Sequence, residues 1–122
     1  MQWSNENSLD DAKRNGVDVH MNNPGQELNY HGVLNDTKSP QFGANYGYPL
    51  CIAARDPTIL PANTEIQIGT QFVYGTVGGI NTDDLCAPKQ APRLTFPAHT
   101  APIDLEFNAN GSALYVTFHG SW

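Results

Sequence analysis

Polar and apolar residues alternate in several short stretches of the chain, which is the pattern of β-strands with one face in solvent. Residues 65–69 and 71–74 show it in the middle of the chain, and residues 1–4 indicate the end of another strand. Helical spacing is nearly absent. The one weak helical candidate covers residues 8–14, and we interpret it as a turn or a single helical turn, because a glycine follows closely.

The strongest β signal lies near the C-terminal end. Ile103, Leu105 and Phe107 alternate with acidic residues, and residues 108–112 form a turn cluster with an Asn-Gly pair. Residues 113–118 then form a dense run of β-forming residues. The pattern predicts an antiparallel hairpin.

The middle of the chain is rich in loops, with breaks at residues 22–25, 36–44 and 75–84. Long loops held by short strands often carry function. The sequence predicts an all-β chain. Both of its ends fall within β patterns, so we expect residues 1–122 to be a fragment of a single larger β domain.

Charge excludes two classes of partner. The chain has 12 Asp and Glu against 6 Lys and Arg, a formal charge of −6. Nucleic acid and anionic membrane surfaces bind mainly through Lys and Arg, so neither is expected as a partner. The sequence has no run of 18 apolar residues, so no membrane insertion is expected either.

Cys51 and Cys86 are the two cysteines of the chain. In a chain rich in Gly, Pro and Asn, an even pair favours one disulfide in an oxidising compartment, which would contribute about 3–4 kcal/mol. Two free buried thiols in a cytosolic protein are the alternative. The glycosylation sequons at residues 35–37 and 110–112 also favour a secreted protein.

Common catalytic patterns are absent from the sequence. It has no dinucleotide-binding glycine pattern, no P-loop, no His-Glu-x-x-His, no Gly-x-Ser-x-Gly and no zinc-ligand spacing. Asp104 and Glu106 have the spacing of a carboxylate pair, but two acids opposite an apolar strand face are typical of a solvated surface.

Four segments stand out for their chemistry. Residues 3–8 offer hard oxygen donors of the kind Ca²⁺ prefers. Residues 45–49 place two tyrosines around a glycine, a pattern more typical of packing. His99 lies in a loop before the hairpin, and His119 precedes a glycine at a strand end, where it would point into the rim of a cleft. A lone histidine is more often structural than functional.

Taken together, these segments resemble the fungal pyrroloquinoline quinone (PQQ)-dependent pyranose dehydrogenases and, more distantly, the sorbosone and soluble aldose dehydrogenases. The resemblance covers nearly the whole chain. Its most specific segments are Asn45-Tyr46-Gly47-Tyr48-Pro49 and Phe118-His119-Gly120-Ser121-Trp122. It also rests on Glu6-Asn7-Ser8, Asn22 to Gly32, Pro92 to Phe96 and Ala101-Pro102-Ile103-Asp104.

The resemblance implies a six-bladed β-propeller, of which this chain would supply about two antiparallel blades with long loops. It implies PQQ beside a Ca²⁺ ion, and a sugar substrate oxidised by hydride transfer to the quinone. Electrons would then pass to a haem domain or a soluble acceptor.

The resemblance also assigns candidate residues one by one. Asn7 and Ser8 match the segment that offers calcium ligands. His119 and Trp122 fall in the motif that lines the quinone site, and His99 is a weaker candidate at its rim. His31 and Arg93 are interpreted as structural, the arginine packing through its stem.

The general base and the main arginine for the quinone carboxylates lie outside this chain in the family pattern. We therefore expect the isolated chain to bind quinone weakly or not at all, and to be inactive. A small secreted, non-enzymatic β module that binds carbohydrate or a protein partner is the alternative. A propeller relative that has lost its chemistry is a third interpretation.

Overall fold

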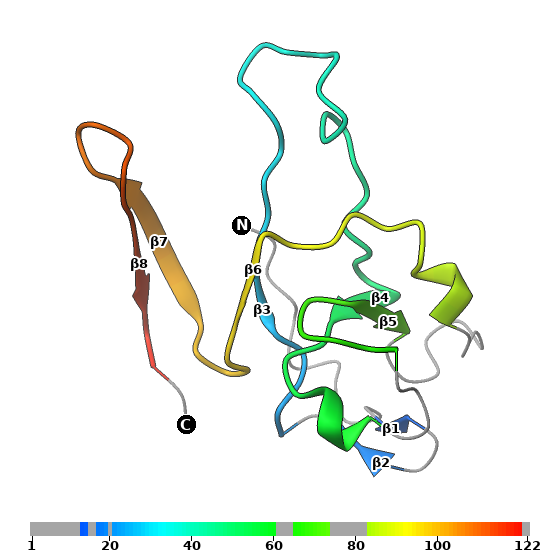
Figure 1. Ribbon diagram of the computed structural model, residues 1–122. Coiled ribbons are helices and arrows are strands. Elements are labelled where there is room, and N and C mark those ends of the chain that lie inside the picture. The colour runs from blue at the N-terminus through cyan, green and yellow to red at the C-terminus, as the bar shows by residue number, and fades with distance from the viewer. Residues whose placement is uncertain (1–12, 15–16, 20, 61–64, 74–82, 121–122) are drawn as a thin grey trace.

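The computed structural model describes residues 13–14, 17–19, 21–60, 65–73 and 83–120. Within these residues the strands are short and pair as four two-stranded antiparallel sheets (Figure 1). The strands are β1 (Lys13–Arg14), β2 (Val17–Asp18), β3 (Gln26–Leu28), β4 (Cys51–Ala53), β5 (Gln71–Val73), β6 (Leu94–Phe96), β7 (Pro102–Phe107) and β8 (Leu114–Phe118). Two single 3₁₀ turns, η2 (Pro57–Ile59) and η4 (Asp83–Leu85), complete the regular structure.

The all-β prediction is confirmed, although the described residues do not form a propeller. The pairs are β1–β2, β3–β6, β4–β5 and β7–β8. None of the helical segments among the described residues is long and apolar enough to span a bilayer.

The core lies around β4 and β5, whose residues are all buried. Ile52 pairs with Phe72 across the sheet, and both belong to one apolar cluster with Val19, Ala54, Leu60 and Ile66. Cys51 pairs with Val73, and these two pack with Cys86 in a second cluster. Because side chains alternate along a strand, this small sheet buries one cluster on each face.

The Cys51–Cys86 disulfide is present, with a Cα–Cα distance of 5.7 Å. It ties β4 to the segment that follows η4. Asp83 of η4 accepts a hydrogen bond from the backbone N–H of Val73 at 3.0 Å, so η4 is joined to the β4–β5 sheet on both sides. The predicted disulfide is thus confirmed.

The predicted C-terminal hairpin is confirmed as β7 and β8, and Figure 1 shows it standing apart from the other sheets. A T-shaped contact between Phe96 and Phe118, 5.0 Å between ring centroids, joins it to β6. Ile103, Phe107 and Tyr115 remain more than half exposed. Apolar side chains therefore remain uncovered along the hairpin.

Two sequence predictions differ from the structure. Residues 65–69 form turns rather than a strand, because the backbone N–H of Gln67 donates to Thr70 Oγ1 and Gly69 adopts a φ of +86°. Lys13 and Arg14, within the weak helical candidate, form β1. The other residues of that candidate, and the strand expected at residues 1–4, lie outside the described residues.

Candidate functional site

The backbone brings His99 and His119 to the same end of the hairpin. The N–H of His119 donates to the Ala101 carbonyl at 3.0 Å, and the N–H of Gly120 donates to the Thr100 carbonyl at 3.3 Å. These bonds continue the β7–β8 pairing into the preceding loop, residues 97–101. His119 is exposed, whereas His99 is only 9% exposed.

The loop of residues 97–101 holds a compact, strained backbone. His99 and Ala101 have φ angles of 62° and 44°, in the left-handed region that residues other than glycine rarely adopt. Such conformations cost about 1–3 kcal/mol each and are concentrated at functional sites. The hydroxyl of Thr100 donates to the Pro97 carbonyl at 2.8 Å and helps to hold the turn.

A hollow of about 400 Å³ lies beside this loop. Its lining combines the loop with the residues before β3 and after β4. The lining residues are Met21, Asn22, Arg55, Asp56, Ile68, Pro97 and Ala98. The hollow thus places one guanidinium, one carboxylate and one amide next to the His99 loop.

A buried asparagine positions the charged pair of this hollow. Asn23 is fully buried, and its Oδ1 accepts from the backbone N–H groups of Arg55 at 2.7 Å and Asp56 at 3.2 Å. Its Nδ2 donates to the Asp56 carbonyl at 3.3 Å. The turn that presents Arg55 and Asp56 is therefore fixed from inside.

The Asp56 carboxylate is held in its ionised form. Hydrogen bonds from the side chain and then the backbone of Thr58 lower the pKa of Asp56 below its usual value, and Asn22 donates to the same carboxylate at 2.9 Å. The bond from the backbone N–H of Thr58 also caps the start of η2. The hollow therefore presents a fixed negative charge beside the Arg55 guanidinium.

Three of the predicted site residues, Asn7, Ser8 and Trp122, lie outside the described residues, so their expected convergence with His119 stays a prediction. Among the residues that the structure describes, no group of three or more His, Cys, Asp or Glu side chains could hold a metal ion. The structure therefore places His99 and His119 at the same end of the hairpin. The calcium site at Asn7 and Ser8 stays a prediction.

The two residues interpreted as structural lie at the other end of the β3–β6 sheet. His31 packs against Tyr46 with ring centroids 4.7 Å apart. The guanidinium of Arg93 lies 5.1 Å from the centroid of the Tyr30 ring. Both side chains contact aromatic rings, and Arg93 does so through its guanidinium rather than through its stem.

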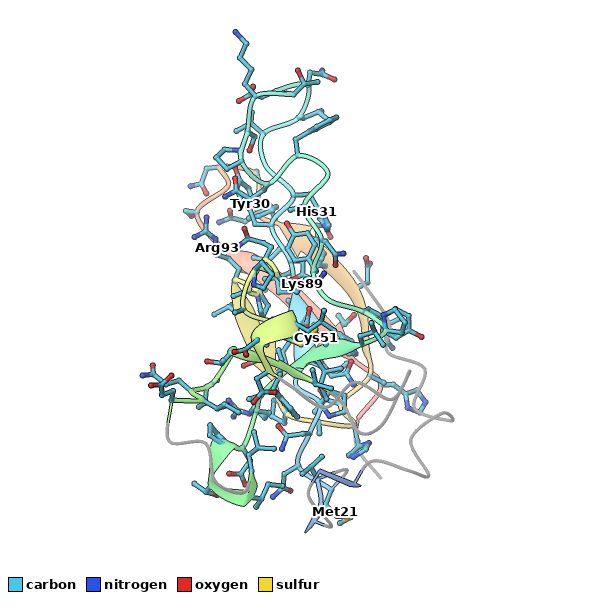
Figure 2. All side chains as sticks on the ribbon, turned by 90° about the vertical axis from the view of Figure 1, so that its right-hand side faces the viewer. Met21, Tyr30, His31, Cys51, Lys89 and Arg93 are labelled. Atoms are coloured by element: carbon cyan, nitrogen blue, oxygen red, sulfur yellow. A yellow bond between two sulfur atoms is a disulfide. The ribbon has the colours of Figure 1, made fainter. Side chains whose placement is uncertain are left out.

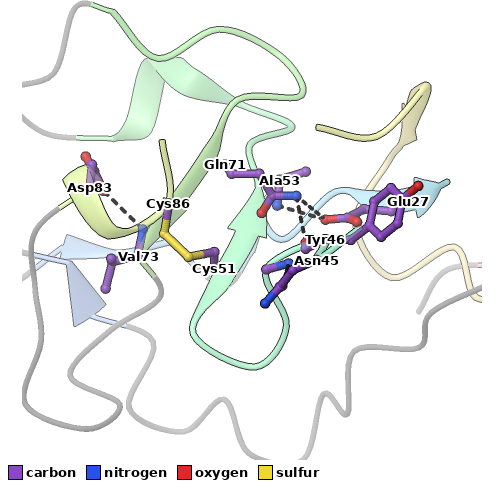
Figure 3. Close-up of a disulfide and its surroundings, with 10 residues drawn as sticks. Glu27, Asn45, Tyr46, Cys51, Ala53, Gln71, Val73, Asp83 and Cys86 are labelled. Carbon is purple, nitrogen blue, oxygen red and sulfur yellow. Dashed lines mark hydrogen bonds between the residues drawn. A yellow bond between two sulfur atoms is a disulfide. The ribbon is translucent and has the colours of Figure 1, made fainter. Parts of the chain in front are cut away.

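A partly buried carboxylate missed by the sequence reasoning joins the two central sheets (Figure 3). Glu27 Oε1 accepts from the backbone N–H of Ala53 at 3.1 Å and from Gln71 Nε2 at 3.3 Å. Glu27 Oε2 accepts from Asn29 Nδ2 at 3.0 Å. Burial raises the pKa of Glu27 above 4.5, although these hydrogen bonds oppose the shift. No local sequence signal marks Glu27, because its partners on β4 and β5 are distant in the chain.

Arg55 and Asn22 were also missed as members of the candidate site. The proximity of Arg55 to Pro97 and Ala98 joins segments more than forty positions apart. Nothing in either segment alone indicates that contact.

Comparison with known proteins identifies relatives along the whole chain. The TrAA12-like family model matches residues 1–122. A pyrroloquinoline quinone-dependent sugar dehydrogenase of Hypocrea jecorina is 47% identical over 120 residues, which are 98% of this chain and 27% of that protein. The chain thus spans about a quarter of that relative's length.

Solved structures agree with the sequence match. The calcium structure of Trichoderma reesei Carbohydrate-Active Enzymes Family AA12 has a TM-score of 0.82 and 44% identity, covering 92% of this chain and 27% of that one. The holo form of the pyranose dehydrogenase PQQ domain from Coprinopsis cinerea has a TM-score of 0.69 and 33% identity, covering 85% and 24%. The chain belongs to the TrAA12-like family.

Proposed function

We propose that this chain is part of a PQQ- and calcium-dependent dehydrogenase that oxidises pyranose sugars. The observation that carries the proposal is the family match over all 122 residues, together with relatives named for PQQ-dependent sugar oxidation. Family membership favours this function over a non-enzymatic carbohydrate-binding or protein-binding module.

The proposed fold of the whole domain is a six-bladed β-propeller, with about two blades drawn from this chain. Two features support it: the sheets are small and antiparallel, and the β7–β8 hairpin keeps apolar side chains exposed. A propeller would cover such a hairpin with neighbouring blades. The confirmed disulfide supports our further proposal that the protein is extracellular.

The residues at the His99–His119 edge have the chemistry to hold an anionic quinone. His119 is exposed and available to donate from its ring, and His99 lies in the adjoining loop. The neighbouring hollow holds the Arg55 guanidinium beside the Asp56 carboxylate. Arginine suits carboxylates because its N–H groups form paired, charge-assisted bonds. Trp122 would add a stacking ring, and Asn7 and Ser8 would provide calcium ligands.

When bound, PQQ supplies the acceptor for the hydride of the sugar, and Ca²⁺ supplies a Lewis acid. The residues of this chain bind and orient rather than transfer the proton, since the general base of the family pattern lies elsewhere. Electrons would leave to a haem domain or a soluble acceptor. We propose that the isolated chain is inactive and binds quinone weakly or not at all.

A chimera tests the proposal. The segment of the Hypocrea jecorina relative that matches this chain is replaced by residues 1–122, and sugar-dependent reduction of a dye is measured with PQQ and Ca²⁺. The expected result is activity in the chimera that requires both additions, and none in the isolated chain. A folded chimera without activity, beside an active parent enzyme, would indicate a relative that has lost its chemistry and would overturn the proposal.

A further inference from the structure

A second hollow lies at the end of the β3–β6 sheet opposite the His99 loop. Tyr30 follows β3 and Arg93 precedes β6, and the register pairs Leu28 with Leu94 at this end of the sheet. Figure 2 shows Tyr30 and Arg93 close together and Met21 at the opposite end of the molecule. The hollow measures about 170 Å³ and is lined by Tyr30, Gln41, Gln90, Ala91, Pro92 and Arg93.

Hydrogen bonds between distant segments fix the walls of this hollow. The backbone N–H of Gln90 donates to the Asn45 carbonyl at 2.9 Å, and that of Arg93 donates to the Leu28 carbonyl at 2.8 Å. The Tyr46 hydroxyl donates to the Tyr30 carbonyl at 2.5 Å. The hollow is thus preformed, which lowers the entropic cost of filling it.

Its two amide side chains offer complementary groups to a ligand. Gln41 Oε1 accepts from the Ser39 hydroxyl at 3.0 Å, which leaves the Gln41 NH₂ as a donor for a ligand. Gln90 Nε2 donates to the Ala91 carbonyl at 3.2 Å, which leaves Gln90 Oε1 as the acceptor. A sugar hydroxyl both donates and accepts, so neighbouring hydroxyls of one ring can satisfy both amides.

The remaining lining residues provide apolar surface and one positive charge. Tyr30 is 41% exposed, and its ring, with Pro92, offers apolar area to the C–H groups of a sugar ring. The Arg93 guanidinium lies over the Tyr30 ring, 5.1 Å from its centroid, a contact that restrains it, and among the described residues Arg93 is the one charged side chain in the lining. A restrained guanidinium suits a carboxylate.

We propose that this hollow binds a single pyranose ring and prefers one that carries a carboxylate, a uronic acid. The site requires neither quinone nor calcium, and it does not depend on the proposed dehydrogenase activity. It would add a sugar-binding surface to the protein at the end of the sheet away from His99 and His119.

Ligand-observed NMR titration of the chain tests this, with methyl β-D-glucuronide and methyl β-D-glucoside as probes. The glucuronide carries a carboxylate where the glucoside carries a hydroxymethyl group. We expect the glucuronide to bind about fivefold more tightly than the glucoside. R93Q should remove that preference, and Q90A should weaken the binding of both sugars. K38Q makes the same charge change on the loop between β3 and β4, outside the hollow, and should bind as the wild type does.

Two results would overturn the proposal: neither sugar binds to the folded chain, or R93Q retains the full preference for glucuronide. Circular dichroism of each variant verifies folding. The same titrations in the chimera without quinone provide a second measurement, so that a variant unfolded in the short chain is still tested. Failure of the dehydrogenase assay would leave this result unaffected.

Discussion

Substitution of Glu27 tests how the two central sheets are joined. Its carboxylate accepts hydrogen bonds from the Ala53 N–H, from Gln71 and from Asn29, and burial raises its pKa above 4.5. The native state therefore binds the proton more tightly than the unfolded state does. The contribution of Glu27 to stability is therefore complete below pH 4.5 and is lost as the pH rises through the interval from 4.5 to the raised pKa.

The variant E27Q should remove this pH dependence, because an amide does not ionise. The oxygen of the new amide can keep the hydrogen bonds from Ala53 and Gln71. Its NH₂ group can donate to Asn29 once the Asn29 side-chain amide flips by about 180°. The Asn29 Oδ1 atom is buried without a hydrogen-bond partner at present; the flip gives it one and moves Nδ2 to the unpartnered position, so the number of unsatisfied atoms stays the same. We expect E27Q to lie within about 1 kcal/mol of the wild type at low pH, and to be at least as stable at neutral pH.

The variant E27A should be much less stable. It leaves the buried Ala53 N–H without an acceptor and removes an acceptor of Gln71. Each buried polar group left unsatisfied costs about 1–3 kcal/mol, so a loss of about 2–4 kcal/mol is expected.

Urea unfolding from about pH 4 to about pH 8, in the chain and in the chimera, measures both effects. E106Q, which replaces an exposed carboxylate on β7, is the control and should keep the wild-type pH dependence. The reasoning would be refuted if E27Q kept the wild-type slope, or if E27A were as stable as E27Q.

Three further predictions concern the disulfide, a glycine and a histidine. Replacing Cys51 and Cys86 by Ser should lower the free energy of unfolding by about 3–4 kcal/mol in urea, and an unchanged midpoint would contradict the role given to the disulfide. G47A should be destabilised by more than about 3 kcal/mol, because φ is +101° and the new Cβ would lie 2.7 Å from Cys51 Cβ. The control G43A, where φ is +70° and the space is open, should lose only about 1 kcal/mol of stability. Equal losses in the two variants would exclude the steric explanation. In the chimera, H119A should weaken PQQ binding about tenfold in a fluorescence titration. Equal PQQ affinity in the chimera with and without H119A would show that His119 is not part of the quinone site.

Local patterns predicted the parts of the fold that depend on neighbours in sequence. The hairpin of β7 and β8 follows from alternation around an Asn-Gly turn, and β5 follows from the run that begins at Gln71. Residues 65–69 also alternate, yet the Thr70 hydroxyl accepts from the Gln67 N–H and a turn forms instead. A side chain that competes for the backbone overrides the periodicity there.

Long-range pairing could not be derived in the same way. β3 pairs with β6 through Glu27 and Thr95, which are far apart in the chain, and neither segment specifies its partner. The same limit applies to the candidate site. His99 and His119 could be named as candidates because each lies beside a recognisable motif, whereas Arg55 reaches the His99 loop only through tertiary packing.

The most direct test of the central claim is a titration of the chimera with PQQ in which fluorescence reports binding. The titration is run once with Ca²⁺ and once with a chelator present. Our account predicts saturable binding in the chimera that is lost when Ca²⁺ is removed, and little or no binding by the isolated chain. Micromolar or tighter binding by the isolated chain, or a folded chimera that binds no PQQ while its parent does, would contradict it.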